Sequence, residues 1–156
     1  MLSNEYIAGF FDGEGNIDIR YRTTTGGRYD RFELRCAISQ VCRKPLDKIQ
    51  TLYGGSVAER RGGAIHHYVI TGAQANVFLK AIRPFLLVKA DEADVALDFY
   101  QLIEKTKEGM HVKGQHRIPK QSEEIRNAKI ICFQKIRQIR IGKGLTPKSR
   151  KEYNFA

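Results

Sequence analysis

The sequence has little cysteine, and the few cysteines are not spaced for cross-linking or for a structural metal. Only Cys36, Cys42 and Cys132 occur in 156 residues, and no two of them form a C-x-x-C pair. The odd number and the spacing argue against a disulfide framework and against a structural zinc site. The adjacent His66 and His67 offer no substitute, because neighbouring residues on a strand point to opposite faces and do not chelate one ion together.

Long apolar runs are also absent. No stretch of about 18 apolar residues occurs, which is the length that suggests a membrane-spanning helix, so no membrane partner is expected. No charged-then-apolar leader precedes the first expected helix, so the sequence predicts an intracellular protein. An organelle (chloroplast or mitochondrion) and the cytoplasm of a prokaryote fit this expectation equally well.

Acidic residues are few compared with basic ones. Seventeen Asp and Glu stand against 27 Lys and Arg, which gives a formal charge of +10 and a pI of about 9.7. A small domain with this charge suggests a polyanionic partner, and double-stranded DNA is the first candidate. The hydrophobic content of 42% is enough for a core, and the length suits one compact domain.

The first patterned stretch covers residues 6–15 and reads YIAGFFDGEG. Ser3 or Asn4 can serve as the N-cap of a helix here. Gly9 and Gly13 are four residues apart, so they leave one face of that helix without side chains. A bare face of this kind usually lets another backbone come close.

Two acids, Asp12 and Glu14, lie where this helix must end. The helix macrodipole is negative at that end, so carboxylates there need a cation, and a bound divalent metal would supply one. The alternative is that Gly13 and Gly15 are ordinary C-cap glycines and that both acids are solvated. Local physics leaves both interpretations open.

The later parts of the chain predict two hairpins and further helices. Apolar and polar residues alternate over residues 16–40 around Gly26 and Gly27, which indicates two half-buried strands joined by a turn. The order predicts an α+β fold, an αββαββα arrangement whose four-stranded antiparallel sheet carries helices on one face. We expect one domain over residues 1–139 and a basic tail over residues 140–156. The later elements expected are a helix over 43–52, strands over 56–61 and 64–71, and helices over 73–82, 90–106 and 122–139.

The other face of the expected sheet is polar and rich in arginine. Such a curved surface can enter the major groove and read base edges, with arginine suited to guanine and with Asp18 and Glu33 suited to cytosine. The alternative is a solvated sheet face that binds nothing. The candidate DNA-contacting residues are Asn16, Asp18, Arg20, Arg22, Arg28, Arg31, Glu33, Arg35, Ala37, Ser56, Ala58, Arg60, His67 and Val69.

Residues 7–15, IAGFFDGEG, resemble the motif of the LAGLIDADG homing endonucleases. The helix–hairpin–helix–hairpin order and the stretch PFLLVK at residues 84–89 are also similar to the single-motif members of that family. The sequence contains one copy of the motif, so the resemblance implies a homodimer in which the two motif helices pack together. The implied interface residues are Ala8, Gly9 and Gly13. The DNA site of such a symmetric dimer is pseudo-palindromic.

The resemblance also implies a metal site at the end of the motif. It places the metal-binding, catalytic acid at Glu14, with the backbone carbonyl of Gly13 beside it, and it gives Asp12 a structural role. The implied cofactor is Mg²⁺, and Mn²⁺ or Ca²⁺ would occupy the same sites.

Three further catalytic positions follow from the resemblance. Lys89 matches an active-site lysine, and Gln40 matches a glutamine that orients solvent. The family's arginine corresponds to Arg43 or to Lys44, because the spacing in this chain is shorter.

The implied function is sequence-specific, metal-dependent hydrolysis of both strands of a long pseudo-palindromic DNA site. It leaves short 3′ overhangs, and the enzyme is expected to be intron-encoded. Two alternatives remain: an RNA-splicing maturase, whose partner would be the host intron RNA, and a DNA-binding module on the same fold that does not cleave. Glu14 and Lys89 disfavour the last of these, whereas no sequence feature excludes a maturase.

Overall fold

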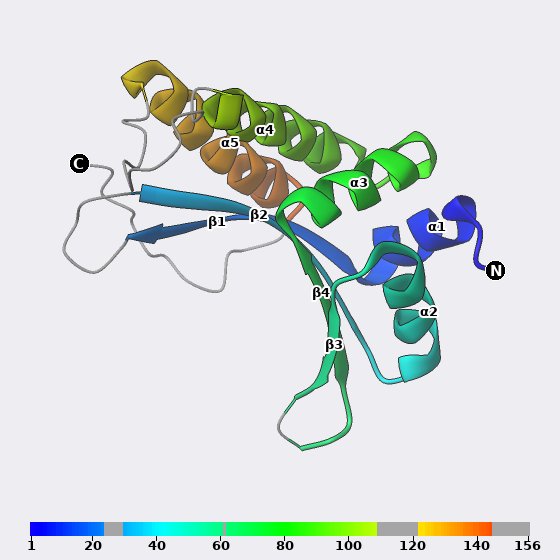
Figure 1. Ribbon diagram of the computed structural model, residues 1–156. Helices are drawn as coiled ribbons and strands as arrows, with labels where there is room; N and C mark the ends of the chain where they lie inside the picture. Colours follow the sequence, from blue (N-terminus) through cyan, green and yellow to red (C-terminus); the bar gives the residue numbers. More distant parts are fainter. Residues whose placement is uncertain (24–29, 61, 109–121, 145–156) are drawn as a thin grey trace, which may run out of the picture.

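The computed structural model describes residues 1–23, 30–60, 62–108 and 122–144. Helices cover one side of a single sheet (Figure 1), so the predicted α+β fold is confirmed. No helix in the described ranges is long and apolar enough to cross a membrane. The elements in chain order are α1 (Asn4–Glu14), β1 (Gly15–Thr23), β2 (Asp30–Gln40), α2 (Arg43–Tyr53), β3 (Ser56–Glu59), β4 (His66–Thr71), α3 (Gly72–Ile82), η1 (Arg83–Phe85), α4 (Ala90–Glu108) and α5 (Glu123–Gly142).

The sheet is antiparallel and has the strand order β1-β2-β4-β3, so β1 and β3 are its edges. Asp18 pairs with Arg35, and Arg35 pairs in turn with Thr71. Side chains alternate between the two faces of a strand, so this register fixes which residues share a face. Ile17 and Ile19 of β1 and Leu34 of β2 face the helices and are at most 1% exposed.

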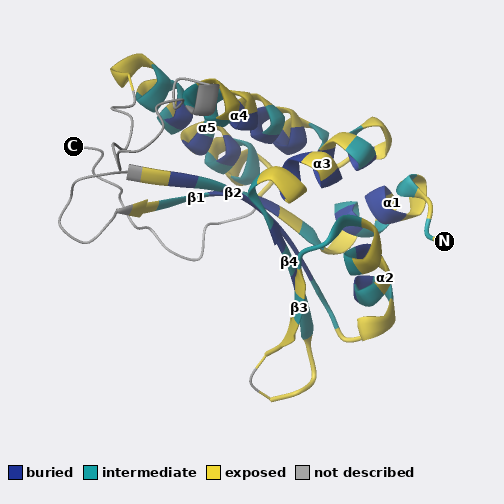
Figure 2. Cartoon of the chain, in the orientation of Figure 1, coloured by how far each residue is buried: buried dark blue, intermediate teal, exposed yellow. Residues whose placement is uncertain are grey.

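Aromatic side chains fasten the helices to the covered face of the sheet. The ring of Phe32 on β2 lies 6.4 Å from that of Phe99 on α4 and 6.3 Å from that of Phe133 on α5. Phe11 of α1 meets Phe78 of α3 edge-to-face at 5.3 Å. Large buried rings contribute much of the apolar area in a core of this size. They therefore pack α4 and α5 against β2, and α1 against α3. Figure 2 marks the buried positions on the strands and on the helices that cover them.

The junction between α1 and β1 is too tight for any residue but glycine. A Cβ at Gly15 would lie 2.3 Å from Phe11 Cδ2 and 2.5 Å from the carbonyl oxygen of Phe11. The helix therefore passes directly into the edge strand without a loop. This places Glu14, the last residue of α1, beside the first residues of β1.

Several boundaries differ from the sequence prediction. Strand β4 begins at His66 and β3 ends at Glu59, so Arg60 lies just beyond its strand. Helix α5 continues to Gly142, so Arg140 belongs to a helix and not to a tail. Arg28, most of the basic loop after α4 and residues 145–156 lie outside the described residues.

Candidate nucleic-acid interface and catalytic site

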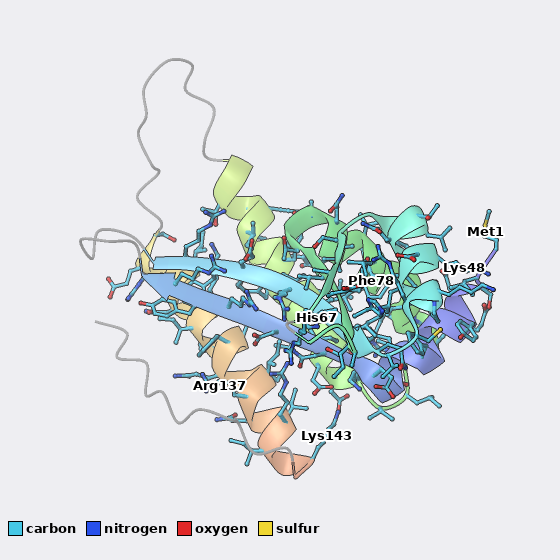
Figure 3. All side chains as sticks on the ribbon, turned by 90° about the horizontal axis from the view of Figure 1, so that it is seen from below. Met1, Lys48, His67, Phe78, Arg137 and Lys143 are labelled. Carbon is cyan, nitrogen blue, oxygen red and sulfur yellow. The ribbon has the colours of Figure 1, made fainter. Side chains whose placement is uncertain are left out.

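The face of the sheet that the helices leave open carries the predicted DNA-contacting side chains. In β1 and β2 the register places Asn16 opposite Ala37, Arg20 opposite Glu33 and Arg22 opposite Arg31. In the other hairpin, Val69 pairs with Ser56 and His67 pairs with Ala58. Figure 3 views this face from below, with His67 near its middle. The predicted sharing of one face is confirmed for the strand residues, and their contact with DNA stays a prediction.

Two exposed arginines lie toward the outer end of β1 and β2. Arg22 and Arg31 are exposed and pair across the two strands. Within the described part of the chain, neither forms a hydrogen bond or an ion pair. Two adjacent guanidinium groups repel each other in the free protein, so an anion such as a phosphate group would relieve this repulsion.

His67 has no ring nitrogen available for a base. Arg35 Nη2 lies 2.8 Å from His67 Nε2, and Ser39 Oγ lies 2.8 Å from His67 Nδ1. Because a guanidinium only donates, Nε2 accepts, and the neutral ring donates its Nδ1 proton to Ser39. Burial holds the pKa of His67 below its ordinary value, and the charges of Arg35, Arg60 and Arg20 lower it further. In this structure His67 therefore supports Arg35, and its contact with DNA stays a prediction.

Arg35 lies along the sheet and covers its neighbour. Its pairing partner is Thr71, yet its guanidinium reaches His67, which pairs with Ser39 four residues further along β2. Arg35 is 9% exposed, and Ala37, which lies between Arg35 and Ser39 on the same face, is 3% exposed. Both were predicted to contact DNA, but they offer little surface to a base, because their side chains are used in packing on the sheet face itself.

Glu14 is the acid that remains free at the end of α1. Its side chain is exposed and has no hydrogen bond or ion pair to any described residue. No group of three or more His, Cys, Asp or Glu in the described ranges could hold a metal ion. The metal-binding role of Glu14 therefore stays a prediction.

Asp12 fixes the segment that carries Lys89. Its carboxylate accepts the backbone N–H groups of Leu87, Val88 and Lys89 at 2.7, 3.1 and 2.9 Å. Lys89 Nζ donates to the carbonyl oxygen of Asp12. These bonds span more than 70 residues of sequence and bring Lys89 to the last turn of α1, the helix that ends at Glu14. The structural role assigned to Asp12 is confirmed.

Two cations from the end of α5 also reach this region, and the sequence reasoning missed both. Lys143 Nζ donates to the carbonyl of Val88 and lies 3.2 Å from Glu92, which is 4% exposed. Arg140 Nη2 donates to Asn16 Oδ1 at 2.8 Å. Burial lowers the pKa of Lys89, and Lys143 and Arg140 lower it further against the opposing charges of Glu92 and Asp12. Their spacing of three, about one helical turn, was the available signal, but the sequence analysis placed both residues in a tail, whereas Arg140 lies on α5 and Lys143 is its C-cap.

The structure does not connect the other two catalytic candidates with Glu14. Gln40 pairs with His66 on β4. Its side chain leaves β2 on the same helix-covered face as that of Ile38, two residues earlier, and its Oε1 accepts the N–H of Val41. Arg43 lies on α2, where its Nε donates to both carboxylate oxygens of Asp47. Their catalytic roles stay predictions.

The glycine face of α1 is open, but Ala8 is not part of it. A Cβ placed at Gly9 or at Gly13 would meet nothing within 4 Å. Ala8 is 0% exposed and belongs to the chain's own core, so its prediction as an interface residue is wrong. Residue 8 lies about 100° around the helix from residue 9, because an α-helix has 3.6 residues per turn.

Replacing Asp12 by asparagine is expected to lower the free energy of unfolding by about 1–2 kcal/mol at pH 7, because an amide accepts fewer of the three N–H groups. Burial raises the pKa of Asp12, but the N–H groups and Lys89 lower it more, so the folded value lies below the ordinary 3.8. The wild-type advantage is therefore present above pH 3.8 and is lost as the pH falls through the folded value. Urea unfolding over a pH series measures it.

Asp47→Asn is the control for this experiment. Asp47 is about half exposed and pairs with Arg43 on its own helix, so its loss is expected to cost less than about 0.5 kcal/mol. An Asp12→Asn effect that stays constant down to pH 2 would contradict the role given to the carboxylate.

Known proteins resemble this chain both in sequence and in fold. The family model for LAGLIDADG endonuclease matches residues 7–95. The archaeal intron-encoded homing endonuclease I-Vdi141I, solved in complex with DNA, has a TM-score of 0.68 at 18% identity, over 97% of this chain and 88% of that one. The comparison with curated proteins found no match.

Two further solved structures are similar. The homing endonuclease I-CvuI, in complex with an I-CreI target and 2 mM Mg, has a TM-score of 0.61 at 20% identity, over 85% of this chain and 93% of that one. I-LtrWI, bound to target DNA, has a TM-score of 0.64 at 17% identity, over 86% of this chain and 44% of that one. At 17–20% sequence identity, the similarity to these three solved structures shows that this chain has the same fold.

Proposed function

The chain belongs to the LAGLIDADG endonuclease family, and from that premise we propose that it is an intron-encoded homing endonuclease. It hydrolyses both strands of a long pseudo-palindromic DNA site and leaves short 3′ overhangs. One observation carries the proposal. The acid Glu14, which is exposed and has no partner among the described residues, ends α1 at the edge of an open, cationic sheet face, and Asp12 of the same helix holds Lys89.

The metal cofactor is Mg²⁺, with Mn²⁺ or Ca²⁺ able to occupy the same sites. Glu14 and the carbonyl of Gly13 would hold it, since these divalent cations prefer oxygen ligands and Mg²⁺ takes one or two carboxylates together with phosphate oxygens. The residues fit this role because both are exposed at the negative end of α1, where a cation is favoured. When bound, the metal activates a water and stabilises charge on the phosphate.

The chain's own residues supply position and charge. The open sheet face binds the duplex, with Arg20, Arg22 and Arg31 reaching toward bases and phosphates. Lys89, fixed through Asp12, adds positive charge near the phosphate to be cut, which favours the more negative transition state. We assign no step to Gln40 or Arg43.

Two copies of the chain form the active enzyme. On the exposed side of α1, the surface at Gly9 and Gly13 is open, and the rings of Tyr6 and Phe10 stack on the same helix. Leu87 is 87% exposed and belongs to the segment that Asp12 holds against the same helix. Apolar side chains beside a glycine face favour a second helix packed at short distance. A symmetric pair would bring two Glu14 carboxylates together, one for each strand.

A cleavage assay tests the function. The substrate is a duplex made from the joined DNA that flanks the reading frame at its insertion point, which a homing enzyme is expected to cut. In Mg²⁺ both strands should be cut at one place with short 3′ overhangs, and EDTA should stop the reaction. An intact duplex, or cutting that persists in EDTA, contradicts the proposal.

A further inference from the structure

The end of α5 reaches around the edge of the sheet to its open face. Helix α5 packs on β1 from the covered side, where Phe133 lies beside the ring of Tyr21. Because β1 is an edge strand, a long side chain can pass around it. Arg140 does so, and its guanidinium donates to Asn16 Oδ1 at 2.8 Å and lies 3.8 Å from Asp18 Oδ1. Figure 3 shows α5 alongside the sheet, with Lys143 at its end.

This contact fixes the orientation of the Asn16 amide. A guanidinium has five donors and no acceptor, so only the oxygen of Asn16 can face Arg140. The Nδ2 group then points away from Arg140, and in the described part of the chain it has no partner. Asn16 is exposed on the open face two residues after Glu14. It therefore presents a hydrogen-bond donor to the region nearest the catalytic acid.

We propose that Arg140 is a positioning residue for base recognition, which holds Asn16 as a donor so that the base pair nearest Glu14 is read as guanine. This inference rests on the proposed function. In the major groove guanine offers two acceptors, N7 and O6, whereas adenine and thymine offer one each, N7 and O4, and cytosine offers the donor N4. Bidentate recognition of adenine needs Oδ1 of asparagine as an acceptor in addition to Nδ2, and Arg140 stands at Oδ1. Arg140 thus favours guanine, the base with two acceptors, over adenine without touching a base.

The test is a binding-site selection in EDTA, where nothing is cut, from a duplex library with randomised half-sites. Wild-type protein is expected to enrich guanine at one inner position of each half-site. Arg140→Met should free the amide, reduce that preference by about five- to tenfold and admit adenine. Asn16→Ala should remove the preference at the same position, and the double variant should add nothing further. Arg140→Lys, which restores a donor, should recover part of it.

Lys135→Met is the matched control, because Lys135 is exposed on the same helix and its loss removes the same charge. It should leave the selected sequence unchanged. If Arg140→Met weakens all sequences equally and keeps the wild-type preference, Arg140 is a phosphate contact and the inference is overturned. If wild-type protein enriches no sequence, the proposed function itself fails and the inference fails with it. Thermal unfolding of each variant confirms that it is folded.

Discussion

Cleavage of DNA is expected to fall by about 10²–10³-fold or more when Glu14 is replaced by glutamine. The amide has nearly the shape of the carboxylate, but it lacks the negative charge that a divalent cation requires. The fold should not change, because Glu14 is exposed and has no partner among the described residues. Without metal, binding to DNA should stay the same or become tighter, since an unpaired acid near the phosphates is removed.

Two measurements on the same duplex separate these effects. Cleavage is followed in Mg²⁺, and binding is followed by fluorescence anisotropy in EDTA. Glu104→Gln is the control, because Glu104 is exposed on α4, on the helix side of the sheet, and its loss should change neither quantity. Full cutting by Glu14→Gln would remove Glu14 from the catalytic site, and a loss of binding in EDTA would show that Glu14 serves the fold or the DNA contact.

The sheet and its two faces were predictable from the sequence because a half-buried strand has a period of two. A shift of one residue would exchange the faces of β1, bringing Arg20 into the core and Ile19 to the surface, so the pattern determines the register. The same period of two predicts that Asn16 and Val69 both lie on the open face of the sheet. Element ends were less certain, because local patterns weaken at the last turn of a helix, and Arg140 was misplaced for that reason.

The partners of individual side chains were not predictable, because they depend on contacts between distant parts of the chain. Asp12 binds backbone atoms more than 70 residues away. His67 was predicted to contact DNA, but it supports Arg35, a neighbour that only the pairing of β2 with β4 brings near. Periodicity indicates the face on which a side chain lies, and packing on that face decides whether the side chain stays available to a ligand.

The open face of α1 leads to the second large expected effect, the loss of the dimer on replacing Gly9 by leucine. In the single chain a Cβ at Gly9 meets nothing within 4 Å, and leucine is a better helix former than glycine by about 0.5–1 kcal/mol. The folded monomer should therefore be as stable as the wild type or slightly more stable. In a close-packed pair the new side chain would overlap the partner helix, at about 1–3 kcal/mol for each copy, and symmetry makes the clash occur twice.

Sedimentation equilibrium then distinguishes a pair of 17.8 kDa chains from a single one. Wild-type protein is expected at twice the mass of the chain, and Gly9→Leu at the mass of one chain with an unchanged circular dichroism spectrum. Gln134→Leu adds the same side chain to an exposed position on α5, and it should remain dimeric, which controls for added apolar surface. The monomeric variant should also cut neither strand efficiently, because the proposed active enzyme combines the Glu14 residues of two chains. A Gly9→Leu protein that keeps the dimer mass would show that the glycine face of α1 is not the interface.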